Sequence, residues 1–366
     1  MFIKKSNISR KSYFMNLALI QARKSLGNTK TNPSVGCLIV KDNFIVSAGF
    51  TGYNGTPHAE KNAISINNKD IKNSTLYSTL EPCSNHGKTP PCVNLIIKSK
   101  IKKVFFAIND PDVRSFKKSQ KKFRSEKISV KNNINKFQSR YFYRSYIKYK
   151  NKDLPFVTGK LAVSKDFYSI NKKKKWITNT YSRGRVHLLR SSHDCLLSTF
   201  GTVIKDDPNF TCRINGLEHT SPARIILDKN LKISTNFNII KTAKKYKTII
   251  FFNNAKLKKI NILKNYGVKL YKIPVDRFNK LILLDVLKKI HFLGYSRVFL
   301  ESGLRLTEIF LKNSLIDDFY LFISNEKIGI NGENNFRKNM KFFTNKKKIN
   351  DKVNLLGDTM LSYRLK

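Results

Sequence analysis

Residues 79–92 read TLEPCSNHGKTPPC, and this segment places Cys83 and Cys92 nine positions apart. The earlier segment His58-Ala59-Glu60 adds an imidazole and a carboxylate. One imidazole and two thiols are ligands that Zn²⁺ favours, and three protein ligands leave a fourth tetrahedral position for water, as in catalytic zinc sites. The sequence therefore predicts His58, Cys83 and Cys92 as zinc ligands. The alternative is that all three are unrelated core residues.

Glu60 supplies a carboxylate that is not needed to hold the metal. Zinc lowers the pKa of a bound water to ~7, so hydroxide is available at neutral pH. An amino group on a pyrimidine is a poor leaving group until it is protonated. A carboxylate that takes the proton of the water and delivers it to the departing nitrogen meets both needs. Glu60 is therefore the predicted catalytic proton shuttle.

Strand-like and helix-like segments alternate around these motifs. Residues 13–26 carry apolar residues at helical spacing after Ser12, a candidate helix cap. We expect further helices at 58–66 and 91–98, and strands at 35–41, 44–50, 75–80 and 103–108. This alternation indicates an α/β sheet with helices on its faces.

Residues 115–152 form the densest basic segment, with 13 basic residues and one acidic residue, Glu126. Their aromatic residues gather in one cluster instead of alternating as platforms for stacked bases: Phe137, Tyr141, Phe142, Tyr143, Tyr146 and Tyr149. The cluster favours an interdomain helix that packs against a neighbour.

The pattern His-x-Glu, then Pro-Cys and a second Cys, resembles the cytidine and nucleobase deaminases, with eight residues instead of two between the cysteines. That insertion, NPSVG at 32–36 and Asp110-Pro111 are similar to the deaminase half of the bifunctional riboflavin-biosynthesis deaminase/reductases. The resemblance implies a cytidine-deaminase-like three-layer α/β domain over residues 1–150. It also implies substrate contacts from Asn32 and His86. His86 either donates to a substrate phosphate or caps the loop, because Lys88 could serve the same anion.

A second set of elements begins at Pro155, so we place a domain boundary near residue 150. We expect strands at 156–163, 224–228, 247–252, 297–301 and 317–323, and helices at 183–191, 281–292 and 304–311. Gly-x-Gly occurs nowhere in the chain, so the usual dinucleotide fingerprint of a Rossmann fold is missing. Any nicotinamide cofactor must be bound in another way.

Several segments of this second half are similar to the reductase half of the same family: KLAVS-x-D at 160–166, WIT at 176–178, LLR at 188–190, GTV-x-x-DDP-x-FT-x-R at 201–213 and ESG at 301–303. The resemblance implies a dihydrofolate-reductase-like α/β domain over residues 151–366 that uses NADPH. The implied cofactor contacts are Val163, Trp176, Thr202, Asp206, Gly303, Leu304, Arg305, Leu306, Thr307, Glu308 and Ile309. The implied substrate contacts are Arg190, Phe210, Arg213 and Glu301.

The residues themselves agree with this assignment. Gly303, between a predicted strand and a predicted helix, lets the backbone approach a phosphate at the helix N-terminus. Thr202 and Asp206 can hydrogen-bond a cofactor, and Arg190 and Arg213 are cations suited to a substrate phosphate. The alternative is a simple turn at 206–208 with a surface arginine at 213.

The second half departs from the family pattern at two places. The family continues Asp166 with Gly and a basic residue, whereas this chain has Phe167-Tyr168. The polar loop before Trp176 is shorter and consists of Asn171 and the lysines 172–175, without the expected substrate-contacting serine. A deaminase with a decayed reductase domain is therefore an alternative function.

The chain has 366 residues, and 71 Lys+Arg against 24 Asp+Glu give a formal charge of 71 − 24 = +47. The excess is spread along the chain, which favours a solvated surface. The alternative from another class is an RNA-binding or RNA-editing protein, but the insertion between the cysteines would crowd a polynucleotide. No stretch approaches the ~20 apolar residues of a membrane helix, and the basic N-terminus lacks the apolar core of a secretion signal. We expect a cytoplasmic protein with no membrane and no specific nucleic-acid partner.

The resemblance thus implies a bifunctional enzyme of riboflavin biosynthesis. It deaminates 2,5-diamino-6-(5-phosphoribosylamino)pyrimidin-4-one by hydrolysis and then reduces the ribosyl side chain to ribityl with NADPH. The expected cofactors are one Zn²⁺ per chain and NADPH. The family commonly dimerises through its reductase half, which implies a homodimer.

Overall fold

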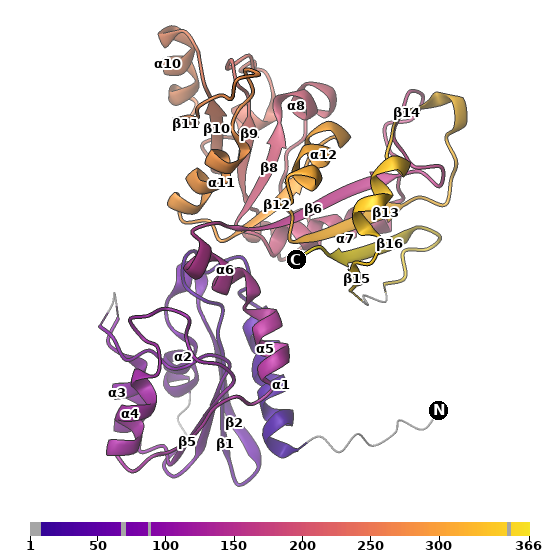
Figure 1. The fold of residues 1–366 in the computed structure, drawn as a ribbon. Helices are drawn as coiled ribbons and strands as arrows, with labels where there is room; N and C mark the ends of the chain where they lie inside the picture. The colour runs from indigo at the N-terminus through magenta and orange to yellow at the C-terminus, as the bar shows by residue number, and fades with distance from the viewer. Residues whose placement is uncertain (1–8, 67–70, 87–88, 350–352) are drawn as a thin grey trace. The chain divides into compact units, whose positions relative to one another are not determined.

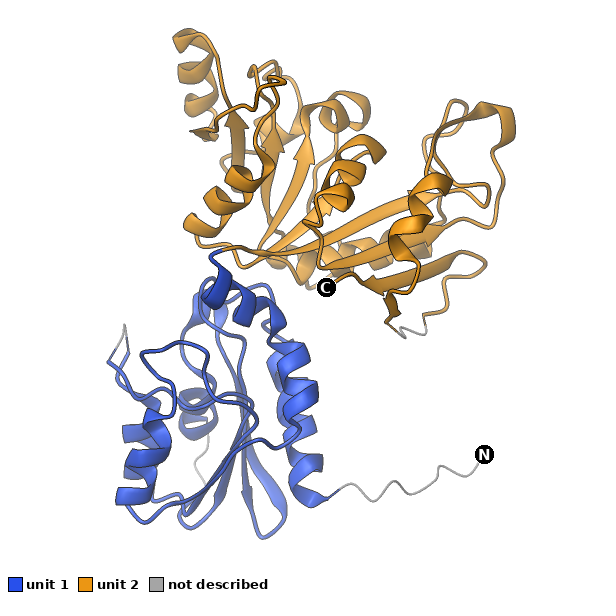
Figure 2. Ribbon diagram, in the orientation of Figure 1, with its two compact units in different colours: residues 1–153 blue, residues 154–366 orange. Residues whose placement is uncertain are grey.

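The chain divides between Asp153 and Leu154 into two compact α/β units in the computed structural model (Figures 1 and 2). The structure describes residues 9–66, 71–86, 89–349 and 353–366. We call residues 1–153 unit 1 and residues 154–366 unit 2, and we describe each by itself.

Unit 1 is built on a five-stranded sheet. Its strands are β1 (Gly36–Lys41), β2 (Phe44–Phe50), β3 (Thr75–Ser78), β4 (Lys103–Phe106) and β5 (Ser129–Lys131). Their order is β2-β1-β3-β4-β5, with β1 antiparallel to β2 and β3, and with β3, β4 and β5 parallel. The helices are α1 (Arg10–Arg23), α2 (Ala59–Ser65), α3 (Cys92–Lys98), α4 (Lys118–Ser125), α5 (Lys136–Phe142) and α6 (Arg144–Lys152), with the 3₁₀ helix η1 (Tyr53–Gly55).

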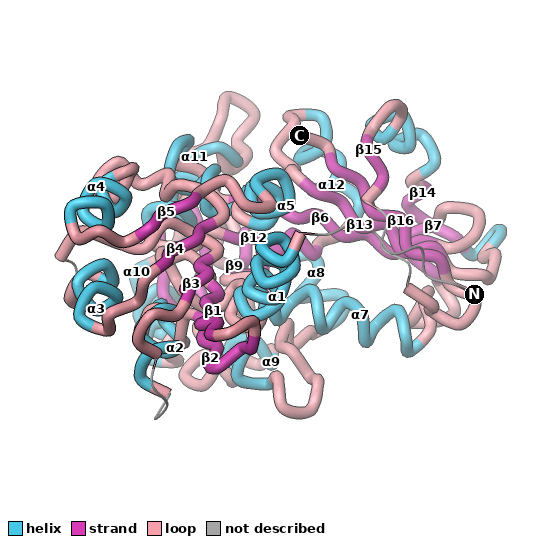
Figure 3. Tube along the Cα trace, turned by 90° about the horizontal axis from the view of Figure 1, so that it is seen from below, coloured by secondary structure: helices cyan, strands magenta, loops and turns pink. Residues whose placement is uncertain are grey.

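Helices cover both faces of this sheet. Alternate residues of β1 point to opposite faces, so Leu38 packs with Met15 of α1, whereas Ile39 packs in a cluster that includes Ala63 of α2 and Ile96 of α3. Figure 3 shows α1 and α5 on one side of the strands and α2, α3 and α4 on the other. The predicted three-layer architecture of the first half is confirmed.

Two glycines let helices approach the sheet of unit 1 closely. A Cβ atom at Gly36 would lie 1.9 Å from the carbonyl oxygen of Ala18 in α1, and one at Gly49 would lie 2.4 Å from that of Ala59 in α2. Any side chain at these positions would push the helix away from the sheet. Because α2 begins directly after His58, the close packing at Gly49 also sets the position of that histidine.

Unit 2 is built on a nine-stranded sheet with the order β11-β10-β9-β8-β12-β6-β13-β16-β15. These strands are β6 (Phe156–Val163), β8 (Cys195–Thr199), β9 (Ala223–Leu227), β10 (Thr248–Phe252), β11 (Lys269–Lys272), β12 (Arg297–Glu301), β13 (Asp318–Ile323), β15 (Lys347–Lys348) and β16 (Thr359–Arg364). The run from β11 to β13 is parallel, and β16 is antiparallel to β13 and β15. A separate pair joins β7 (Tyr168–Asn171) to β14 (Gly332–Asn335).

Helices also cover both faces of the large sheet. They are α7 (Thr180–Ser191), α8 (Phe200–Asp206), α9 (Asn238–Lys241), α10 (Leu257–Asn265), α11 (Leu283–Phe292) and α12 (Leu304–Lys312), with η2 (Glu218–Thr220), η3 (Gly329–Asn331) and η4 (Arg337–Phe343). One core cluster contains Leu287 of α11 and Phe310 of α12, and a second contains Leu189 of α7 and Leu263 of α10. The carboxyl ends of the parallel strands share one edge of the sheet, where α/β folds commonly bind ligands.

Some of the expectations differ from the structure. Helix α1 begins at Arg10 and is capped by Ser9, whose Oγ accepts from the backbone N–H of Ser12, so the predicted cap at Ser12 is wrong. The aromatic cluster of residues 137–149 lies on two helices, α5 and α6, which meet at Tyr143, instead of on one helix. The central strand β8 was not predicted.

Strands 44–50, 156–163 and 297–301 begin and end where the sequence predicts them. In the described ranges, no helix is both long and apolar enough to cross a lipid bilayer.

Candidate active sites

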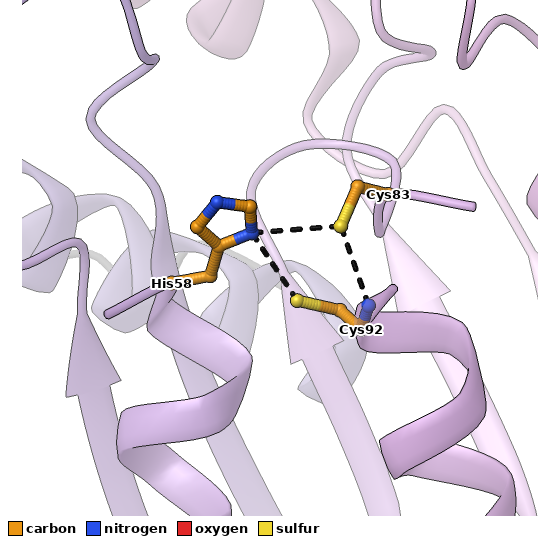
Figure 4. A group of neighbouring side chains, drawn as sticks. All are labelled: His58, Cys83 and Cys92. Carbon is orange, nitrogen blue, oxygen red and sulfur yellow. Dashed lines mark hydrogen bonds between the residues drawn. The ribbon is translucent and has the colours of Figure 1, made fainter. Parts of the chain in front are cut away.

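Three segments of unit 1 bring His58, Cys83 and Cys92 together (Figure 4). His58 immediately precedes α2, Cys83 lies in the loop after β3, and Cys92 is the first residue of α3. The Nδ1 atom of His58 lies 3.5 Å from Sγ of Cys83 and 3.3 Å from Sγ of Cys92, and all ligand atoms lie within 4.8 Å of one another. One nitrogen and two sulfur ligands at this separation fit a tetrahedral Zn²⁺ with one position left for water.

Hydrogen bonds within the cluster favour a thiolate at Cys83. A hydrogen bond with Cys92 lowers the pKa of the Cys83 thiol, and His58 and the backbone N–H of Cys92, 3.3 Å from the sulfur, act in the same direction. The hydrogen bond to Cys83 in turn raises the pKa of His58. Because a thiolate is the form of cysteine that binds a metal, the donor set suits Zn²⁺ chemically as well as geometrically.

Glu60 lies in the first turn of α2 and is 4% exposed. Its Oε1 accepts a hydrogen bond of 3.1 Å from Oγ of Ser78, the last residue of β3. Burial raises the pKa of Glu60, and the neighbouring Cys83 raises it further. A carboxyl group with a raised pKa accepts and releases a proton more readily near neutral pH, as a proton shuttle requires.

Glu81 was quoted in the sequence motif without a role, and the structure gives it one. Its buried carboxylate accepts hydrogen bonds from the backbone N–H groups of Asp110, Lys117 and Ser119 and from Oγ of Ser119, at 2.8–3.3 Å. These bonds attach the loop after β4 to the segment that carries Cys83. Glu81 therefore has a structural role in the site, because its carboxylate already accepts these hydrogen bonds.

Two predicted substrate contacts of unit 1 lie in loops of this site. Nδ2 of Asn32 donates to the carbonyl oxygen of Gly55 at 2.9 Å, three residues before His58. His86 is exposed in the loop between the two cysteines. Lys88, the alternative partner for an anion, lies outside the described residues.

The site in unit 2 gathers at the carboxyl ends of β6, β8 and β12. Arg190 of α7 forms a bidentate ion pair with Glu301, the last residue of β12, with both N···O distances at 2.8 Å. Both side chains are mostly buried, and Nη1 of Arg190 also donates to the carbonyl oxygen of Thr211 at 2.9 Å. The sequence indicated Arg190 as a cation for a phosphate, whereas the structure shows that Glu301 already balances its charge.

Arg213 is an exposed cation of this region. Its backbone N–H donates to Nδ1 of His187 at 3.2 Å, and burial lowers the pKa of His187 to about 4. Nδ1 of His187 also lies 3.0 Å from the carbonyl oxygen of Thr211, so the imidazole holds the loop that carries Arg213 against α7.

The segment Gly303 to Ile309, predicted to bind the cofactor, begins α12. A Cβ atom at Gly303 would meet nothing within 4 Å, so the space beside the helix N-terminus is open. Leu304 and Thr307 are buried in the core, whereas Arg305 is exposed. Since the first N–H groups of a helix have no partner within it, this segment offers backbone donors to a phosphate more than it offers side chains.

Two predicted contacts of unit 2 have buried side chains. Val163 is fully buried in the core at the end of β6, and its carbonyl oxygen accepts from the N–H of Ser324. Phe210 is also buried, with a positive φ of 52°. Both side chains pack in the core, and the predicted ligand contacts of the two residues stay predictions.

Thr202, Asp206 and Trp176 remain accessible. Thr202 and Asp206 lie at the two ends of α8, which follows β8. Partial burial raises the pKa of Asp206. The charge of Lys175 lowers this pKa, and the charge of Glu301 raises it. Trp176 is 56% exposed, and its ring lies under the guanidinium of Arg183 at 4.9 Å and Nζ of Lys175 at 5.5 Å.

The segment that departs from the family pattern is ordered by contacts of its own. Phe167 has a φ of 70°, in the left-handed region that favours glycine, and its ring packs against the core. The ring of Tyr168 lies where a Cβ at Gly332 would be, 2.3 Å from its Cγ. Lys172 pairs with Glu333 at 3.3 Å and Lys174 with Glu326 at 3.2 Å.

Sequence reasoning missed three contributors to the sites. Ser78 holds Glu60, and Lys160 of β6 lies in register with Glu301. Arg224 is fully buried and donates to the backbone carbonyls of residues 209, 239 and 246 at 3.0–3.2 Å. The motif KLAVS includes Lys160. No local sequence signal marks Ser78 or Arg224, because each contacts a segment that is distant in the chain. Cys37, Cys195 and Cys212 are buried.

Comparisons with known proteins cover both units. The family described as the cytidine and deoxycytidylate deaminase zinc-binding region matches residues 8–108, and that described as the RibD C-terminal domain matches residues 155–345. The riboflavin biosynthesis protein RibD of Aquifex aeolicus is 34% identical over 86% of this chain and 87% of its own length. The RibD protein of Bacillus amyloliquefaciens is 33% identical over 87% of this chain and 85% of its own.

A solved structure is also similar to the chain over almost its full length. It is the diaminohydroxyphosphoribosylaminopyrimidine deaminase/5-amino-6-(5-phosphoribosylamino)uracil reductase of Thermotoga maritima, with a TM-score of 0.83 and 29% identity. The match covers 98% of this chain and 99% of that one.

Proposed function

The chain belongs to the RibD family of riboflavin biosynthesis proteins, which pair a deaminase with a reductase, and we propose that unit 1 holds the deaminase and unit 2 the reductase. The protein is thus a bifunctional enzyme of riboflavin biosynthesis, and neither an RNA-binding protein nor a deaminase with a decayed second domain is favoured. The cluster of His58, Cys83 and Cys92 beside buried Glu60 is the observation that carries the assignment of unit 1.

In unit 1, His58, Cys83 and Cys92 would hold one Zn²⁺. When bound, the ion supplies hydroxide at neutral pH by lowering the pKa of water to ~7. Glu60 takes the proton of the attacking water and delivers it to the amino nitrogen of the pyrimidine, which leaves as ammonia while the ring carbon gains oxygen. Ser78 keeps the carboxyl group of Glu60 in place through its hydrogen bond.

The substrate of this step is 2,5-diamino-6-(5-phosphoribosylamino)pyrimidin-4-one. The exposed imidazole of His86 and the amide of Asn32 would contact it, since both lie on loops next to the metal ligands. The substrate named for the Thermotoga maritima relative supports this choice.

In unit 2, the open N-terminus of α12 at Gly303 would bind a phosphate of NADPH through backbone N–H groups. When bound, NADPH supplies the hydride that reduces the ribosyl side chain to ribityl. Thr202, Asp206 and Trp176 remain available to orient the cofactor, and Arg213 remains available for the substrate phosphate. Glu301 fixes the guanidinium of Arg190, which also donates to the carbonyl oxygen of Thr211 in the loop that carries Arg213. A homodimer through unit 2 and a cytoplasmic location stay predictions.

One assay tests both halves of the proposal. The purified full chain receives the diaminopyrimidinone phosphate with and without NADPH, while ammonia release and the loss of NADPH absorbance are followed separately. We expect ammonia in both reactions and NADPH oxidation only after deamination. Absence of ammonia would contradict the assignment of unit 1, and ammonia without NADPH oxidation would contradict that of unit 2.

A further inference from the structure

Helix α6 is the last helix of unit 1 (Figure 1). Together with Tyr143, the residue before it, the helix carries three polar groups at helical spacing. Tyr143 lies at the junction of α5 and α6, Tyr146 lies one turn further on, and Lys150 follows another turn later. Residues three and four positions apart share one face of a helix. Together, these three side chains contact three loops of the deaminase unit.

Tyr143 connects the loop before β1 to the loop after β3. Its hydroxyl donates to the carbonyl oxygen of Ser34 at 3.1 Å and lies 2.6 Å from Oγ1 of Thr79, which accepts from the N–H of Gly36 at 3.0 Å. These hydrogen-bond directions are compatible, because the Tyr143 hydroxyl donates to Ser34 and accepts from the hydroxyl of Thr79. Ser34 lies two residues after Asn32, and Thr79 lies four residues before Cys83. All these groups are buried, so little water replaces a lost partner.

Tyr146 and Lys150 hold the loop after β4. The Tyr146 hydroxyl donates to Oδ1 of Asp110 at 3.1 Å, and Nζ of Lys150 lies 2.9 Å from Oδ2 of Asp112. The pKa of Asp110 is raised by burial to about 6, so its carboxyl group depends on the tyrosine as a donor.

The same loop reaches the segment between the two cysteines. Asp112 binds the guanidinium of Arg114 through two bonds of 2.9 and 2.6 Å. The carbonyl oxygen of Arg114 accepts from the side-chain amide of Asn85. A continuous path of hydrogen bonds therefore runs from α6 to the loop that carries Cys83 and Cys92.

We propose that Tyr143, Tyr146 and Lys150 of the α6 face are positioning residues for deamination, which fix the three loops around the pyrimidine without touching it. The inference rests on the deaminase assignment of unit 1. Asn32 lies in one of these loops, and Asn85 and His86 lie in another. Zn²⁺ and Glu60 are held by other contacts, namely by their own cluster and by Ser78. Loss of the α6 contacts should therefore weaken substrate binding more than chemistry.

Tyr143→Phe and Tyr146→Phe test this inference, because each removes one hydroxyl and leaves the ring in the core. Each variant should raise the KM of deamination about five- to tenfold, since one hydrogen bond is worth about 1 kcal/mol. The kcat and the zinc content should stay within about twofold of wild type. Lys150→Met should raise KM, and Lys150→Arg should keep it near wild type, because arginine retains the ion pair with Asp112.

Tyr13→Phe is the matched control, since Tyr13 is an exposed tyrosine that belongs to α1 and not to the α6 face. NADPH oxidation with pre-formed deaminated substrate serves as a control within the same chain. An unchanged KM in both α6 variants would overturn the inference. A parallel fall in kcat, zinc content and Tm at unchanged KM would also overturn it, because it would indicate a purely stabilising helix. Absence of ammonia release from wild type would instead refute the deaminase assignment.

Discussion

In unit 1 the proposed chemistry lies on side chains that converge, whereas in unit 2 much of it lies on the backbone and on exposed residues. His58, Cys83 and Cys92 meet within 4.8 Å, and Glu60 is buried. In unit 2, Gly303 offers N–H groups at the start of a helix, and Trp176 is more than half exposed. The difference follows from the reactions, because hydrolysis needs placed acids and ligands whereas hydride transfer needs mainly orientation of a cofactor. Single substitutions should therefore act more sharply in unit 1.

The largest expected effect is in unit 1. Glu60→Gln should slow deamination by roughly 10²-fold or more, because the amide cannot shuttle the proton, yet it should keep one zinc per chain. Metal analysis and ammonia release measure the two quantities. The variant that carries both Cys83→Ala and Cys92→Ala is the contrast and should lose the zinc as well. Normal deamination by Glu60→Gln would show that another group moves the proton.

The second effect is on the stability of unit 2. Arg224→Met should lower its free energy of unfolding by about 3 kcal/mol, because three buried carbonyl oxygens lose their donor. Denaturant titration followed by both activities would show the reductase lost first and the deaminase unchanged. Coincident loss of both activities at lower denaturant would show that the two units do not unfold separately.

Arg213→Ala should raise the KM of the reductase for the pyrimidine phosphate about tenfold, since a charge-assisted hydrogen bond is worth about 1.5–3 kcal/mol. The KM for NADPH should change much less. Steady-state rates with each substrate varied in turn distinguish the two constants. A larger change in the KM for NADPH would indicate that Arg213 belongs to the cofactor site instead.

The smallest effect concerns the lysines 172–175. Changing Lys172 and Lys174 to Gln should alter the KM for NADPH less than twofold, because both already pair with glutamates at the surface. Changing Lys173 and Lys175 to Gln should raise this KM two- to threefold at low salt, and the difference should shrink at 0.5 M salt, where screening is strong. Equal effects of the two double variants would show that the ion pairs do not matter.

The sequence predicted the cluster of His58, Cys83 and Cys92 because its signals are local. His58 and Glu60 lie within three residues, and Cys92 begins a helix that was predicted one residue early. Strand 156–163 was also predicted with the right ends, since it is bounded by Pro155 and Ser164. By contrast, the strand β8 was not predicted, because it has only five residues and α8 follows it directly.

Long-range pairing explains the remaining errors. The ion pair of Arg190 with Glu301 joins residues 111 positions apart, so a sequence motif alone left Arg190 as a free cation. Tyr143 and Tyr146 were grouped as packing residues, and nothing local indicated that their hydroxyls bind Ser34 and Asp110. Such contacts depend on the fold, whereas a sequence motif shows only which residues are present.

The contact of Tyr168 with Gly332 constrains how this chain can change by mutation. A Cβ at Gly332 would lie 2.3 Å from the ring, so no larger residue is tolerated there while the tyrosine is present. If Tyr168 is first replaced by a small residue, position 332 becomes permissive, whereas the reverse order passes through a clashing intermediate. The two positions are thus epistatic with a preferred order of substitution, although 164 residues separate them in the chain.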